Sequence, residues 1–196
     1  LEVAPERVIH SNSTERVIKE LPSVGFSGDY FYRPLAVDGA FIPYRGTVMT
    51  IDPSGRGSDE TGYCIMSMLN GFLYVHECSG VAGGYSTETL TALAELAKKY
   101  NVKEIQTESN FGDGMYTKLF TPILQKHHRC IVEEVKHSTQ KEVRSIDTLE
   151  PVMSTHRLVV DQRVIEDDFE TAKDVKFSLF YQMTRLTKDR GSLNHD

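Results

Sequence analysis

Two apolar runs separated by Asn70-Gly71 constrain the fold of this chain more than any other feature. The runs cover residues 61–69 and 72–78, and Asn-Gly between such runs is a strong β-hairpin signal because both residues accept a positive φ. A third apolar run, 47–52, precedes the pair. The sequence therefore predicts three consecutive strands, of which the last two are antiparallel.

Helical and strand patterns alternate after this hairpin. Apolar residues recur at helical spacing over about 86–100, 114–127, 139–156 and 165–187. Short apolar runs predict further strands at 102–107, 130–135 and 158–160. This order is typical of an α/β protein with a mixed sheet and helices on both faces.

Length and composition favour one main domain with an appended arm. The chain has 196 residues, 39% of them hydrophobic, which is enough to bury a core. Residues 1–46 hold four of the seven prolines and few apolar periods, so we expect an irregular arm or linker there, followed by a domain at 47–196.

The spacing of the cysteines and the net charge limit the classes of protein to which this chain can belong. The three cysteines show no C-x-x-C spacing, and Cys64 and Cys78 lie in apolar runs, so we expect core thiols in a reducing compartment. No apolar stretch approaches the roughly 20 residues needed to span a bilayer. The net charge of −6 argues against binding nucleic acid by charge alone, but a carboxylate site can bind metal ions that carry positive charge to a phosphate.

Carboxylates stand where two predicted strands end. Asp52 closes the first strand and Glu108 closes the fourth, and a loop rich in Gly and small polar residues follows each. Functional groups collect beyond the carboxyl ends of parallel strands, so parallel neighbours would bring both carboxylates into one crevice. A third acid, Asp196, follows the predicted terminal helix and could fold back toward them.

Three converging carboxylates favour hard, oxygen-binding ions, and Mg²⁺ or Mn²⁺ is the expected occupant. Two such ions about 3.5–4 Å apart can stabilise the attacking and leaving oxygens of a phosphodiester. Asp59 and Asp113 are candidates for a second ion, with an ordinary turn carboxylate as the alternative. His195 could orient water or contact phosphate, or be a surface histidine.

Basic and hydroxyl side chains near these acids are candidate DNA contacts, with a solvated charge as the alternative for each basic residue taken singly. The strongest cluster is Lys141 and Arg144, which are three residues apart on one predicted helical face. The full set consists of Arg56, Lys136, Ser138, Thr139, Lys141, Arg144, Lys188 and Arg190.

Four motifs together resemble the nuclease domain of phage terminase large subunits, and most closely the DNA maturases of short-tailed phages. They are I-D-P-S-G-R-G-S-D-E-T-G (51–62), E-S-N-F-G-D-G (108–114), H-S-T-Q-K-E-V-R (137–144) and D-T-L-E-P-V (147–152). The resemblance implies a ribonuclease H-like fold and a metal-dependent endonuclease that cuts concatemeric double-stranded DNA during packaging. By position, Asp52, Glu108 and Asp196 match the acidic triad of the family, although the family motif reads His-Asp-Asp where this chain ends at Asp196.

The resemblance also implies partners. No G-x-x-x-x-G-K-[ST] motif occurs in this sequence, so residues 1–46 would be a linker from an ATPase domain of the same full-length protein. Double-stranded DNA, the portal and the small terminase subunit are the other implied partners. The implied location is the host cell cytoplasm, without a membrane and outside the mature virion.

Two alternatives remain at this point. One is a non-catalytic docking domain that binds the portal or the ATPase, which the arm and the acidic balance would suit. The other is an actin-like ATPase fold, because D-P-S-G before a hairpin resembles its phosphate loop.

Overall fold

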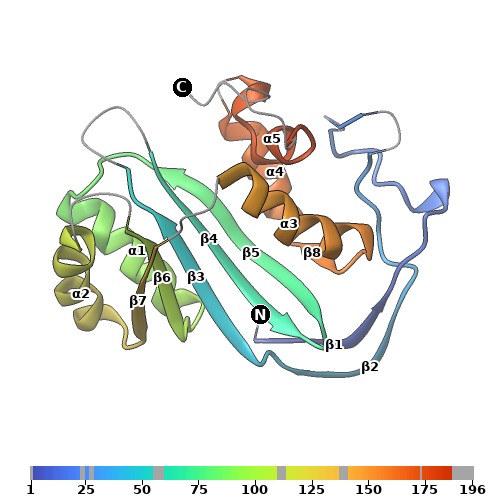
Figure 1. The fold of residues 1–196 in the computed structure, drawn as a ribbon. Helices are drawn as coiled ribbons and strands as arrows, with labels where there is room; N and C mark the ends of the chain where they lie inside the picture. The colour runs from blue at the N-terminus through green and yellow to red at the C-terminus, as the bar shows by residue number, and fades with distance from the viewer. Residues whose placement is uncertain are drawn as a thin grey trace.

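A computed structural model describes the chain over residues 2–22, 25–26, 29–54, 60–109, 114–136, 141–172 and 174–186. Its centre is a six-stranded mixed sheet with the strand order β7-β6-β3-β4-β5-β8 (Figure 1). The strands are β3 (Gly46–Asp52), β4 (Thr61–Leu69), β5 (Phe72–Val81), β6 (Glu104–Glu108), β7 (Ile131–Val135) and β8 (Leu158–Val160).

The antiparallel meander β3-β4-β5 confirms the hairpin expectation. Asn70 and Gly71 adopt φ values of 50° and 81°, the positive values that a tight hairpin turn requires. Strands β6 and β7 extend the sheet in parallel on the β3 side, and β8 pairs in parallel with β5. The α/β fold class predicted from the sequence is therefore confirmed.

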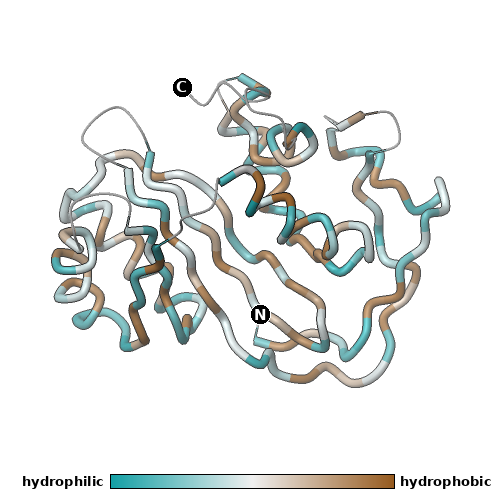
Figure 2. Tube along the Cα trace, in the orientation of Figure 1, coloured by the Kyte–Doolittle hydropathy of each residue, from teal (hydrophilic) through white to brown (hydrophobic). Residues whose placement is uncertain are grey.

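Helices α1 (Thr87–Lys99) and α2 (Met115–His127) pack on one face of the sheet, which we call the core face. The Ser86 side chain accepts the Thr89 N–H and caps α1, whose apolar stripe then meets the strands. Met49, Ile51 and Ile105 are the strand residues at the centre of this core. Hydrophobic residues accordingly recur along β3 and β4 (Figure 2).

The predicted terminal helix 165–187 is wrong. The chain instead forms α4 (Gln162–Thr171), a 3₁₀ turn (Val175–Phe177) and a short α5 (Leu179–Met183). The Asp168 carboxylate accepts the N–H groups of Leu179 and Phe180, which starts α5 in a new direction. This turn lets Phe180 pack on Ile165 and Leu21, which one continuous helix would not allow.

The segment 1–46 is more regular than expected. Strands β1 (Val3–Ile9) and β2 (Ala36–Pro43) form a separate antiparallel two-stranded sheet. It packs through Ala4 against Leu69 and Tyr74 near the hairpin turn. The division into an arm and a domain near residue 46 stays a prediction.

Candidate active site

The carboxylates of Asp52 and Glu108 start from neighbouring positions of two parallel strands. Ile51 of β3 is paired with Thr107 of β6, and the two acids are the next residue of each strand. Adjacent strands lie about 4.8 Å apart, so the two carboxylates share one edge of the sheet. The predicted juxtaposition of these two acids is therefore present in the structure.

Side-chain alternation places both acids on the face opposite the core. Ile51 and Thr107 are almost completely buried under α1 and α2, and successive side chains of a strand point to opposite faces. We call the side that carries Asp52 and Glu108 the acid face. The same two strands therefore anchor the core with one residue and present a carboxylate with the next.

Helix α3 (Lys141–Ser154) begins over the acid face and supplies a cation to each carboxylate. Lys141 Nζ donates to Asp52 Oδ2 at 2.5 Å, and Arg144 Nη2 donates to Glu108 Oε1 at 3.3 Å. Because the two basic residues are three apart, they lie on one face of the helix. The structure thus places Lys141 and Arg144, predicted as DNA contacts, directly against the predicted metal ligands.

The two ion pairs differ in exposure. The side chains of Lys141 and Asp52 are 63% and 47% exposed, whereas those of Arg144 and Glu108 are 27% and 13% exposed. Solvent screens an exposed pair more strongly than a half-buried one, so the Arg144–Glu108 pair holds its geometry more firmly.

A pair of buried hydroxyls closes the base of the loop after Asp52. The Ser54 N–H donates to Thr61 Oγ1 at 3.2 Å, and the two hydroxyl oxygens lie 3.1 Å apart. Both residues are buried, and together they join the end of β3 to the start of β4. These hydroxyl contacts, which we call the hydroxyl clasp, were not predicted from the sequence, although small hydroxyl residues at both ends of a Gly-rich loop are a signal for them.

The remaining predicted site residues fall into two groups. Lys136 follows β7 at the edge of the sheet that carries Glu108, and it is exposed. The other predicted residues lie outside the part of the chain that the structure describes: Arg56, Asp59, Asp113, Ser138, Thr139, Lys188, Arg190, His195 and Asp196.

Asp52 and Glu108 supply two of the ligands that a divalent ion would need. Among the described residues, no group of three or more His, Cys, Asp or Glu could hold a metal ion. Asp52 and Glu108 nevertheless offer side-by-side carboxylate oxygens, the donors that Mg²⁺ and Mn²⁺ prefer. The pair therefore suits the expected ions and leaves room for a third ligand from another part of the chain.

None of the helices in the described segments combines the length and apolar character needed to cross a membrane.

A mixed sheet with two acids at the ends of neighbouring parallel strands is typical of ribonuclease H-like domains. Residues 51–158 match the family described as the ribonuclease H-like domain of the bacteriophage T7 terminase, and the chain belongs to that family. The predicted resemblance to the nuclease domain of phage terminase large subunits is thereby confirmed. The match favours the nuclease hypothesis over an actin-like ATPase.

A curated relative agrees with this assignment, and two solved structures agree with the fold. The chain is 46% identical over 184 residues to the terminase large subunit of Enterobacteria phage T3, covering 91% of this chain and 31% of that protein. It therefore spans about a third of the length of this relative.

The two structures are of the nuclease domain of the large terminase subunit gp2 of bacterial virus Sf6. A mutant form with manganese and beta-thujaplicinol has a TM-score of 0.51 at 13% identity, covering 76% of this chain and 75% of that one. The other structure has a TM-score of 0.50 at 12% identity, with the same coverage. At this identity, the likeness supports the fold alone.

Proposed function

We propose that this chain is a metal-dependent endonuclease domain that cuts concatemeric viral double-stranded DNA during genome packaging. One observation carries the proposal: Asp52 and Glu108 project side by side from parallel strands, and each carboxylate already accepts a hydrogen bond from a cationic side chain. Two neighbouring carboxylates that attract cations provide the negative potential that a divalent ion needs, and the ion would displace the two basic side chains.

Each side chain of the site has a role in this proposal. Asp52, Glu108 and Asp196 would hold two Mg²⁺ or Mn²⁺ ions, with Asp52 as the shared ligand. Bound ions of this kind supply an activated water and stabilise the leaving oxygen of a phosphodiester. Lys141 and Arg144, released from the carboxylates, would contact the phosphates of the DNA backbone.

The relatives support the wider biological setting. The T3 relative is a terminase large subunit, and the Sf6 relative was solved with manganese. We extend from these to an ATPase domain of the same full-length protein, to the portal and small subunit as partners, and to action in the host cytoplasm outside the mature virion.

Plasmid cleavage tests the proposal. Supercoiled plasmid is incubated with the chain and Mg²⁺, Mn²⁺ or EDTA, beside the Asp52→Asn and Glu108→Gln variants. Glu104→Gln is the matched control, because Glu104 lies at the other end of β6. We expect metal-dependent nicking that both site variants lose and the control keeps. Cleavage by Asp52→Asn at the wild-type rate would contradict the assignment.

A second candidate function is a non-catalytic docking domain of the packaging motor. The observation that favours it is the exposed apolar surface of the arm, where the Val37 and Phe41 side chains of β2 are 51% and 63% exposed. Calorimetry with Mn²⁺ separates the two functions. Metal binding that Asp52→Asn abolishes supports the nuclease even if the isolated domain cuts slowly, whereas no metal binding together with portal binding supports docking.

A further inference from the structure

Two cysteines face each other across the centre of the sheet. Cys64 of β4 is paired directly with Cys78 of β5 in the antiparallel register, and both are free thiols. Directly opposed residues of antiparallel strands have Cα atoms about 4.5 or 5.5 Å apart. Disulfides accept Cα separations of about 4.4–6.8 Å, so either pairing type suits a cross-strand bond.

The two thiols already interact. A hydrogen bond with Cys64 lowers the pKa of the Cys78 thiol, while the hydrogen bond with Cys78 and burial raise the pKa of the Cys64 thiol. Cys78 is therefore the better thiolate of the pair.

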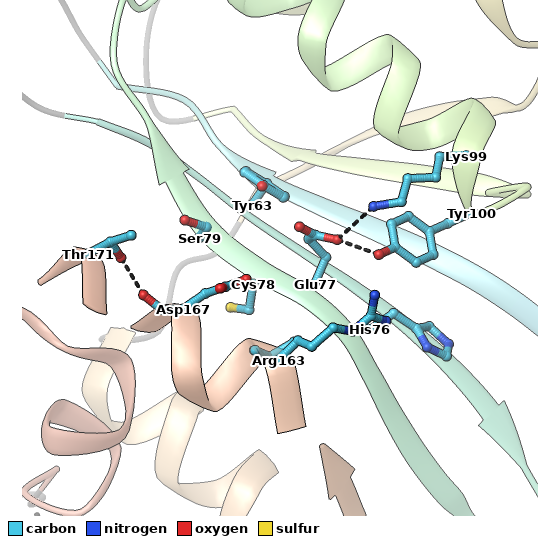
Figure 3. Close-up of a pocket in the computed structure, with 11 residues that line it drawn as sticks. Tyr63, His76, Glu77, Cys78, Ser79, Lys99, Tyr100, Arg163, Asp167 and Thr171 are labelled. Carbon is cyan, nitrogen blue, oxygen red and sulfur yellow. Dashed lines mark hydrogen bonds and ion pairs between the residues drawn. The ribbon is translucent and has the colours of Figure 1, made fainter. Parts of the chain in front are cut away.

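A cavity beside β5 gives access to one of these thiols. The cavity measures about 250 Å³ and lies between β5, the end of α1 and α4 (Figure 3). Cys78 is one of its lining residues, whereas Cys64 is not. Its lining carries two basic side chains, Lys99 and Arg163, and two acidic ones, Glu77 and Asp167, so the charges balance and the cavity suits a small neutral reagent.

The cysteine pair also adjoins the acid face. Cys64 is paired with Thr50 on its other side, and two residues further along these strands Asp52 is paired with Gly62. Strand alternation therefore puts the two thiols on the same side of the sheet as Asp52. A covalent bond here would tie β4 to β5 in the half of the sheet that carries the proposed nuclease site.

We propose that Cys64 and Cys78 form a redox-active dithiol that a low-molecular-weight disulfide oxidises to a cross-strand disulfide. The Cys78 thiolate attacks one sulfur of the small disulfide, which forms a mixed disulfide and releases one thiolate. The Cys64 thiol gives its proton to the released thiolate, and its sulfur attacks Cys78 and expels the second thiolate, which takes up from solvent the proton that Cys78 had released. The two cysteines lose two electrons in total, and the small disulfide becomes two thiols.

The test uses the intact chain and bis(2-hydroxyethyl) disulfide, a neutral reagent chosen for the charge-balanced cavity. Intact mass, thiol titration and peptide mapping are measured before and after treatment. We expect the mass to fall by two hydrogens, one thiol to remain at Cys130, and the melting temperature to rise by several degrees because the bond restricts the unfolded chain. Three titratable thiols, or a persistent reagent adduct on Cys64 or Cys78, would overturn the proposal.

Single substitutions test the order of attack. Cys64→Ser should trap the reagent on Cys78, Cys78→Ser should leave Cys64 unmodified, and the matched control Cys130→Ser should form the disulfide like the wild type. Adduct formation on Cys64 at an unchanged rate in Cys78→Ser would overturn the role of Cys78 as the attacking thiol. If a variant fails to fold, peptide mapping of the wild-type chain still decides whether the disulfide forms.

Discussion

The two faces of strand β3 differ in what holds them together. On the core face, Met49 and Ile51 are packed against α1 and are almost fully buried. On the acid face, the Asp52 side chain is 47% exposed and forms an ion pair with Lys141 of α3. Packing therefore holds the core face, whereas an ion pair holds the Asp52 carboxylate on the other face. The core face should therefore control stability, and the acid face should control metal binding and catalysis.

Substitutions at two consecutive residues give the largest test of this contrast. Ile51→Ala should destabilise the fold by about 2–5 kcal/mol, because it leaves a cavity under α1. Asp52→Asn should leave the unfolding free energy nearly unchanged and lower plasmid cleavage by more than about 100-fold, beyond the usual cost of losing an outer-shell partner. Denaturant unfolding and the nicking assay measure the two effects. Equal destabilisation by both substitutions would show that both faces of β3 contribute to stability, which contradicts the contrast.

The candidate site could be predicted from the sequence only where neighbouring residues carry the signal. The ends of two apolar runs located Asp52 and Glu108, and the rule for parallel strands predicted that they would meet. The pairing of these acids with Lys141 and Arg144 was not predictable, because it joins residues 89 and 36 positions apart through the placement of α3. The break in the terminal helix was missed for a similar reason, since Asp168 accepts N–H groups from residues 11 and 12 positions further along.

The next prediction concerns the half-buried ion pair. Replacing Arg144 with Met removes the cation from Glu108, whose side chain is only 13% exposed. A hydrogen bond to a charged group is worth about 1.5–3 kcal/mol, so an incoming ion that no longer displaces Arg144 should bind about tenfold more tightly or better. Electron paramagnetic resonance of free Mn²⁺ measures the affinity. Weaker Mn²⁺ binding would show that Arg144 orients Glu108 for the ion instead of competing with it.

The exposed ion pair should show a smaller effect of the same sign. Lys141→Met removes a pair that solvent screens, and such pairs are worth at most about 1 kcal/mol, so Mn²⁺ affinity should rise by no more than about fivefold. Lys118→Met, an exposed lysine of α2, is the matched control for the change in net charge. An effect larger than that of Arg144→Met would reverse the ranking of the two pairs.

The smallest change in stability and in Mn²⁺ affinity is expected at the hydroxyl clasp, which joins the end of β3 to the start of β4. Thr61→Val keeps the shape of the side chain but removes the acceptor for Ser54, so it should cost about 1 kcal/mol of stability. Because the clasp lies two residues beyond Asp52, Mn²⁺ binding should also weaken modestly. Thr61→Ser retains the hydroxyl and should restore the affinity. If Thr61→Ser weakens Mn²⁺ binding as much as Thr61→Val does, the packing of the Thr61 methyl group is needed as well as the hydroxyl, and the hydrogen bonds alone do not explain the effect.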